Sequence, residues 1–150
     1  MNSGQINLGL NMESLFTSEM IYDGKKNELP ELKIKQIEFE SDTWKRLLNF
    51  IIDENIHLKK MLSEVLKCRV DKNLLEQIED FHNKLLKQDE FIGLLRNEIA
   101  EFDKFSISEI INDQKIADEA TRKLKNLRYG MMNAERHFSK LKSEFNNFLL

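Results

Sequence analysis

The chain has 150 residues, of which 41% are hydrophobic and 33% are charged, and its formal net charge is −3 at pH 7. This balance is typical of a globular domain and gives no overall attraction to nucleic acid or to an anionic membrane surface. No apolar run reaches the ~18 residues that a membrane-spanning helix needs, and the first residues lack a secretory signal. A single cysteine allows neither an internal disulfide nor a cysteine-based zinc site, so the fold must depend on buried apolar surface. We therefore expect a cytoplasmic domain without a membrane contact.

The N-terminal part of the chain differs in composition from the rest. It contains the only proline and three of the five glycines, and no helical or strand period is sustained along it. A segment of this kind can remain loose, or it can become ordered when a partner binds. We predict a mostly irregular, weakly ordered arm over residues 1–40 and a helical domain over residues 41–150.

Three amphipathic helices are predicted in the second part of the chain, where apolar residues recur with helical periods. They cover about residues 42–69, 72–104 and 107–149. The middle helix alternates four-residue and three-residue apolar steps over about four heptads, which is the pattern of a coiled coil. Both connections are short, so sequential helices run antiparallel. The expected fold is all-α: a long antiparallel three-helix bundle of coiled-coil character.

The third predicted helix has a clear start and one internal glycine. Ser106 and Glu109 form a capping box, which marks the N-terminus of a helix. Gly130 lies inside the helix and costs about 1 kcal/mol relative to alanine. Because the apolar residues on both sides of Gly130 keep the same heptad phase, we predict one continuous helix.

The predicted helices differ in length, at about 40, 50 and 60 Å for a rise of ~1.5 Å per residue. The third helix is therefore expected to extend past the other two and to leave its apolar C-terminal residues uncovered. These residues are Phe145, Phe148, Leu149 and Leu150. Exposed apolar clusters usually mark a contact with a partner or with a second copy of the chain. Folding of the N-terminal arm over the cluster is an equal alternative.

Three polar residues interrupt the apolar seam, the stripe along which the helices face each other. They are Glu54, Gln88 and Thr121, and two tight turns would bring them to one height. A buried polar layer fixes the register and the number of helices, because a shifted alignment leaves each polar group unpaired. One carboxylate with two neutral groups provides neither an acid–base pair nor an activated nucleophile. We therefore predict a structural role for this layer.

A metal-binding bundle is the first alternative function. Glu54 with His57, and Glu79 with His82, form two Glu-x-x-His patterns, a spacing that resembles the one in ferritin-like di-iron bundles. The heptad phase places the two histidines on opposite sides of the seam and points Glu79 outward. The further glutamates of such a site cannot be placed on the other helices. We predict no metal and no bound cofactor.

Nucleic-acid binding through the third helix is the second alternative. Residues 122–142 contain seven basic residues and one acidic residue, whereas residues 98–119 contain seven acidic and two basic residues. The basic residues of the first range are Arg122, Lys123, Lys125, Arg128, Arg136, Lys140 and Lys142. They spread around the helix, which disfavours contact along a phosphate backbone. A solvated surface, or a head-to-tail contact with the acidic range of a second copy, explains the pattern better.

The sequence contains no motif that supports catalysis. A glycine-rich phosphate loop, a nucleophile elbow and a clustered set of metal ligands are all absent from it. We therefore predict that the chain is not an enzyme. The expected function is a non-catalytic interaction or scaffolding module that acts through helix–helix contacts and forms a homo-oligomer.

Overall fold

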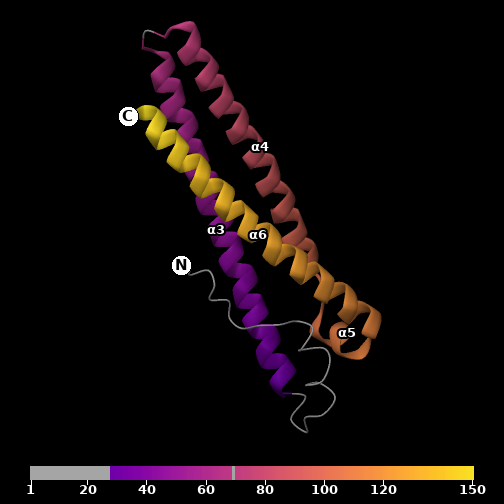
Figure 1. Cartoon of the computed structure of the whole chain (residues 1–150). Coiled ribbons are helices and arrows are strands. Elements are labelled where there is room, and N and C mark those ends of the chain that lie inside the picture. Colours follow the sequence, from indigo (N-terminus) through magenta and orange to yellow (C-terminus); the bar gives the residue numbers. More distant parts are fainter. Residues whose placement is uncertain (1–27, 69) are drawn as a thin grey trace. The chain divides into compact units, whose positions relative to one another are not determined.

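The computed structural model describes residues 28–68 and 70–150, which are helical apart from short connections (Figure 1). The helices are α3 (Glu28–Leu66), α4 (Lys72–Phe102), α5 (Ile107–Asn112) and α6 (Gln114–Leu149). No strand occurs in these residues, so the predicted all-α helical bundle is confirmed. The first part of the predicted arm, residues 1–27, lies outside the described residues. No described helix combines the length and the hydrophobicity that crossing a bilayer requires.

The packing divides the chain into two compact units. Of the described residues, unit 1 contains 28–43 and 99–128, and unit 2 contains those of 44–98 and 129–150. Helices α3, α4 and α6 each contribute residues to both units.

Helix α3 begins earlier than the sequence analysis predicted. Residues 28–40 are helical, so the prediction of an irregular segment is wrong for this part of the arm. Ile34 and Ile37 are buried at 7% and 4% exposure, and they continue the three-and-four spacing of the apolar seam toward the N-terminus. Pro30 lies in the first turn of α3, where a missing backbone N–H breaks no helical hydrogen bond.

Unit 1 has its own apolar core and two polar contacts at its edge. The core residues are Ile34, Ile37, Ile99, Phe102, Ile110, Ala117, Ala120, Leu124 and Leu127. The Ser41 hydroxyl donates to the Asp103 carboxylate at 2.9 Å. The Arg128 guanidinium donates to both carboxylate oxygens of Glu40, at 3.0 and 2.9 Å. Two parallel, charge-assisted hydrogen bonds of this kind fix the geometry of the pair.

The predicted third helix is two helices, α5 and α6, separated at Asp113. The predicted capping box is present: the Ser106 hydroxyl accepts a hydrogen bond from the Glu109 N–H at 3.2 Å and donates to its carboxylate. Helix α5 nevertheless ends at Asn112, because Asp113 has an extended backbone with φ −133° and ψ 111°. The Asp113 carboxylate then accepts the N–H of Lys115 at 2.9 Å and caps α6. A second capping residue thus breaks the helix that the periodicity alone predicts.

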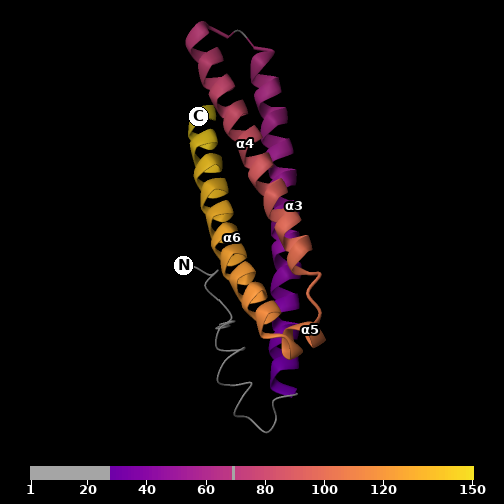
Figure 2. The same cartoon turned by 90° about the vertical axis from the view of Figure 1, so that its right-hand side faces the viewer.

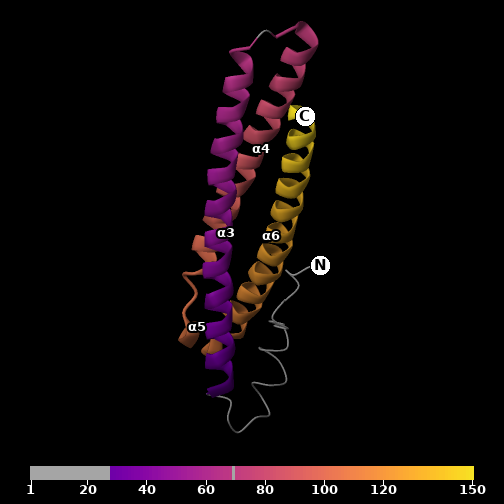
Figure 3. The same ribbon diagram turned by 90° about the vertical axis from the view of Figure 1, so that its left-hand side faces the viewer.

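In unit 2, α4 runs antiparallel to α3 and α6 (Figures 1, 2 and 3), and the three helices share one apolar core cluster. On α4, the residues of the four-and-three pattern in this unit are buried from the second turn onward. They are Ile78, Phe81, Leu85, Gln88, Ile92 and Leu95. Helix α6 continues through Gly130, as predicted. A Cβ atom at Gly130 would lie 2.7 Å from Leu95 Cδ2, so this glycine lets the leucine of α4 approach closely.

The predicted overhang of the third helix is wrong. Helix α6 ends at Leu149 before it reaches the turn between α3 and α4 (Figures 2 and 3). Residues 103–113 form the connection after α4, helix α5 and the break at Asp113. Helix α6 therefore begins at Gln114 instead of residue 107. Its C-terminal residues therefore pack against the α3–α4 hairpin. Phe145 is only 1% exposed.

Candidate functional site

The four residues predicted as a contact surface differ in exposure. Phe145 belongs to the core of unit 2, and Phe148 packs against the same core. The ring of Phe81 lies 5.4 Å from that of Phe145 and 5.0 Å from that of Phe148, between centroids. Leu149 and Leu150 are exposed, at 37% and 102%. The two phenylalanines thus stabilise the fold.

The two Glu-x-x-His pairs are not brought together. The Glu54 carboxylate accepts a hydrogen bond from Lys142 Nζ at 2.5 Å, which engages it in an ion pair. His57, Glu79 and His82 are exposed. Across residues 28–68 and 70–150, no group of three or more His, Cys, Asp or Glu side chains could hold a metal ion.

The predicted polar layer is only partly present. Gln88 is buried at 7% exposure, but Glu54 is half-buried beside the seam. Thr121 lies in unit 1, where its hydroxyl donates to the Ala117 carbonyl of its own helix at 2.8 Å. Neither Glu54 nor Thr121 therefore takes the buried position that the sequence analysis assigned to it.

The buried polar residue of α3 is Asn55, next to the predicted Glu54. Asn55 is fully buried and its amide donates to the Asp89 carboxylate at 3.1 Å. Lys59 forms an ion pair with the other oxygen of Asp89. The carbonyl oxygen of Asn55 and both polar atoms of the Gln88 amide have no hydrogen-bond partner among the described residues. These groups reduce stability but favour one register, as polar seam residues do in coiled coils.

The basic range of the third predicted helix is partly neutralised by α3. Within unit 1, Arg128 pairs with Glu40, and within unit 2, Lys142 pairs with Glu54. Lys142 also lies over the ring of Phe138, with its Nζ 5.7 Å from the centroid. These contacts reduce the positive charge that the helix offers to phosphate groups.

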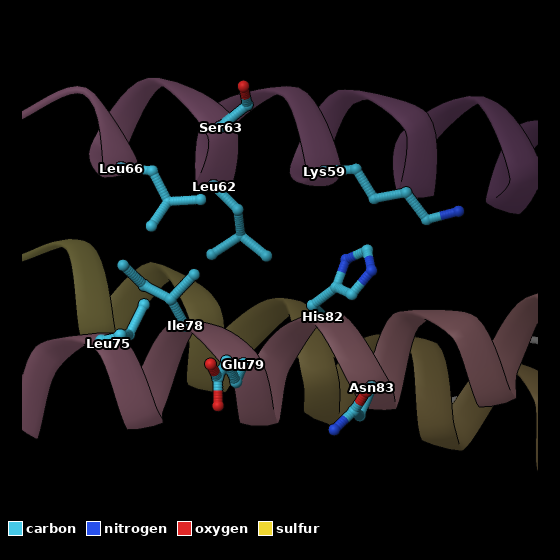
Figure 4. Close-up of a pocket in the computed structure, with 9 residues that line it drawn as sticks. All are labelled: Lys59, Leu62, Ser63, Leu66, Leu75, Ile78, Glu79, His82 and Asn83. Atoms are coloured by element: carbon cyan, nitrogen blue, oxygen red, sulfur yellow. The ribbon is translucent and has the colours of Figure 1, made fainter.

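A groove of about 470 Å³ lies between α3 and α4 in unit 2 (Figure 4). Its lining residues are Lys59, Leu62, Ser63, Leu66, Leu75, Ile78, Glu79, His82 and Asn83, all from these two helices. In the figure, Leu66 of α3 faces Leu75 of α4, and the His82 ring points toward α3 beside Lys59. Helix α6 passes behind the hairpin in this view, so the groove opens on the side away from it.

The groove is one end of a longer surface, which we call the hairpin outer face. Its α3 residues follow steps of four and three, and they are Ile52, Ile56, Lys59, Ser63 and Leu66. Its α4 residues lie on one stripe beside the seam, and they are Leu75, Glu79, His82, Leu86, Asp89 and Gly93. Asp89 forms an ion pair with Lys59 across the face. Four large aliphatic side chains on this face are exposed: Ile56 at 59%, Leu66 at 47%, Leu75 at 41% and Leu86 at 43%.

Gly93 is the feature of this face that contacts within the chain do not explain. It lies inside α4, and a Cβ atom at this position would have no described atom within 4 Å beyond its own helix and chain neighbours. Glycine inside a helix costs about 1 kcal/mol relative to alanine. At Gly130 the approach of Leu95 accounts for that cost, but no such neighbour exists at Gly93. A helical glycine leaves space in which another backbone or a bulky side chain can come close.

A second groove, of about 590 Å³, lies between α4 and α6 in unit 2. Its lining residues are Lys84, Lys87, Gln88, Phe91, Asn133, His137, Lys140, Leu141 and Glu144. The pKa of Lys84 is raised above its usual value, chiefly by a hydrogen bond to Asp80, with Glu144 3.7 Å away. The lining provides no nucleophile paired with a base, so it offers no obvious chemistry.

The hairpin outer face was not predicted, although the sequence contains a signal for it. A second row of apolar residues runs beside the seam, with Ile52 and Ile56 on α3 and Leu75 and Leu86 on α4. Such a row widens the apolar stripe beyond the two positions per heptad that one pair of helices buries. Comparison of the chain with protein families, with curated proteins and with solved structures found no match in any of the three.

Proposed function

We propose that the chain is a non-catalytic interaction module that binds another protein chain through the hairpin outer face. The observation that carries this proposal is Gly93, whose missing side chain leaves open space on a face that also exposes Leu75 and Leu86. An approaching helix would cover the aliphatic side chains and use the space at the glycine. This is helix-on-helix recognition, with apolar anchors for affinity and flanking charges for selectivity.

The size of the apolar contact favours a reversible association. Complete burial of an exposed leucine or isoleucine contributes roughly 1.5–3 kcal/mol, and the four aliphatic side chains of this face are each about half exposed. Their burial therefore contributes on the order of 4 kcal/mol, against the loss of translational and rotational freedom on association. The charged residues around the face must supply part of the affinity.

Other functions have less support from the described residues. The ion pair of Glu54 with Lys142 opposes a di-metal site, and the ion pair of Arg128 with Glu40 opposes phosphate binding. The expected cytoplasmic location stays a prediction.

Site-specific photo-crosslinking tests the proposal. A photoreactive amino acid at Ser63, which is exposed in the groove, should form discrete protein adducts in the cells that make the protein. The double substitution Leu75→Ser and Leu86→Ser should remove these adducts while the helical circular dichroism remains. Leu94→Ser is the matched control, because Leu94 is 61% exposed on α4 but lies outside the hairpin outer face.

A photoreactive group at the exposed Ser139 of α6 controls for random collisions. Adducts at Ser63 that survive the double substitution, or yields equal to those at Ser139, would contradict the proposal. The absence of any protein adduct at Ser63 would contradict it as well.

A further inference from the structure

We infer that the partner on the hairpin outer face is a second copy of this chain, bound so that α3 of one copy lies against α4 of the other. This inference rests on the proposed function and specifies its partner. The two copies are related by a twofold axis that runs parallel to the helices. Both then use the same surface, as in most homodimers.

The direction of the axis follows from the charges on the two helices. On α3, Lys60 lies beside the face, and Lys59 is already paired with Asp89 of its own chain. On α4, Glu79 lies in the face and Glu90 lies beside it. A twofold axis parallel to the helices places α3 of one copy on α4 of the other, so the basic side meets the acidic side. An axis perpendicular to the helices would place α3 on α3 and bring like charges together. Electrostatic complementarity of this kind selects the orientation of an interface.

The register within unit 2 brings two charged residues close to each other in height. Asn55 contacts Asp89, and Leu62 shares a core cluster with Ile78, which aligns the two antiparallel helices. Lys60 and Glu79 consequently differ in height by one to five residues, or roughly 1.5–7.5 Å at ~1.5 Å per residue, which two long side chains can span. Rotation about an axis parallel to the helices preserves height. Lys60 therefore faces the partner's Glu79, and the symmetry makes this contact twice.

The same rotation explains Gly93. Residue Ile52 of α3 lies at nearly the height of Gly93 in the same register, and both residues lie on the groove side of their helices. The twofold rotation carries the partner's Ile52 onto α4 at this point. The open space at Gly93 thus receives a branched side chain, which a methyl group at residue 93 would displace.

One pair of charges opposes the contact. Asp53 and Glu90 are exposed and lie at similar heights, so the rotation places Asp53 near the partner's Glu90. This repulsion limits the affinity. Asp53→Lys replaces this repulsion with attraction. It should tighten self-association by roughly tenfold, because about 1.4 kcal/mol, summed over the two symmetric pairs, corresponds to a factor of ten.

Charge reversal in a mixture is the decisive experiment, with the full purified chain in sedimentation equilibrium over a concentration series. Lys60→Glu alone and Glu79→Lys alone should each weaken self-association by roughly tenfold, because each homodimer contains two repulsive pairs. An equimolar mixture of the two variants should associate like the wild-type chain, because the mixed dimer contains two attractive pairs. High salt should reduce all of these differences.

The mixture separates a contact between copies from an effect inside one chain. A wild-type chain that stays monomeric at every concentration, or a mixture that associates no better than the single variants, would overturn the inference. Strengthened association of Lys60→Glu alone would indicate α3 against α3 and would overturn it too. If Ser63 still cross-links to a different protein in cells, the proposed function stands while the second copy is excluded. Lys60→Glu, Glu79→Lys and Asp53→Lys should all keep the wild-type circular dichroism, since the substituted residues are exposed.

Discussion

Gly93→Ala should make the isolated chain more stable and its self-association weaker. The added methyl group meets no described atom within 4 Å beyond its own helix and chain neighbours, so the substitution creates no overlap within the chain. Alanine is better than glycine inside a helix by about 0.8–1.0 kcal/mol. The free energy of unfolding should therefore rise by roughly that amount. The same methyl group fills the space assigned to the partner's Ile52, and the dissociation constant should increase by about fivefold, or ~1 kcal/mol.

Gly130→Ala is the matched control for this prediction. It gains the same helix propensity, but its Cβ would lie 2.7 Å from Leu95 Cδ2, and Leu95 is only 2% exposed. The buried leucine must move, which offsets the gain, so this variant should be less stable than Gly93→Ala. The free energies come from urea unfolding followed by circular dichroism at protein concentrations low enough to exclude the dimer.

Two results would refute this reasoning. A decrease in stability on Gly93→Ala would mean that the position is already filled within the chain. A gain in stability without any loss of self-association would mean that no partner approaches Gly93.

Three further substitutions test the packing of unit 2 by urea unfolding. Phe145→Ala should lower the free energy of unfolding by about 3–5 kcal/mol, since the side chain is a fully buried core aromatic. A loss below ~1 kcal/mol would contradict this burial. Gln88→Leu should raise stability by about 1–2 kcal/mol, because it removes a buried amide without hydrogen-bond partners, and a destabilised variant would reveal a partner for that amide. Asp89→Ala should cost about 1–3 kcal/mol by leaving the buried Asn55 amide without its acceptor, and a neutral effect would show that water replaces the carboxylate.

The periodic parts of the fold were predictable because burial follows the heptad closely. The four-and-three spacing predicted for the middle helix matches the residues that are buried in α4, and α6 keeps its phase through Gly130. The start of α3 was missed because Pro30 and the glycines before it were interpreted as breakers, although a proline in the first turn is compatible with a helix. The division at Asp113 was missed because a capping side chain competes locally with the periodic pattern and leaves that pattern unchanged.

The exposure predicted for the C-terminal residues depended on where α6 begins more than on its apolar pattern. Shifting the start of α6 to Gln114 brings Phe145 into the core and removes the proposed overhang. The predicted buried polar residue of α3, Glu54, was wrong by one position, since Glu54 and Asn55 are adjacent and both are polar. The sequence places Gly93 inside α4 but does not show its surroundings. Only the structure shows that a Cβ atom at this position would meet open space.

A distance between spin labels at Ser63 tests most directly whether the hairpin outer face is covered by a second copy. Cys68 is the only cysteine, so Cys68→Ser with Ser63→Cys gives a single labelled site in the groove. With neighbouring helix axes 8–10 Å apart, the two α3 helices lie diagonally, and electron paramagnetic resonance should give an inter-label distance of roughly 10–25 Å. A label at Ser139 of α6 should give a much longer distance or none. If concentrated protein shows no coupling between labels at Ser63, the face is not a contact between copies of this chain.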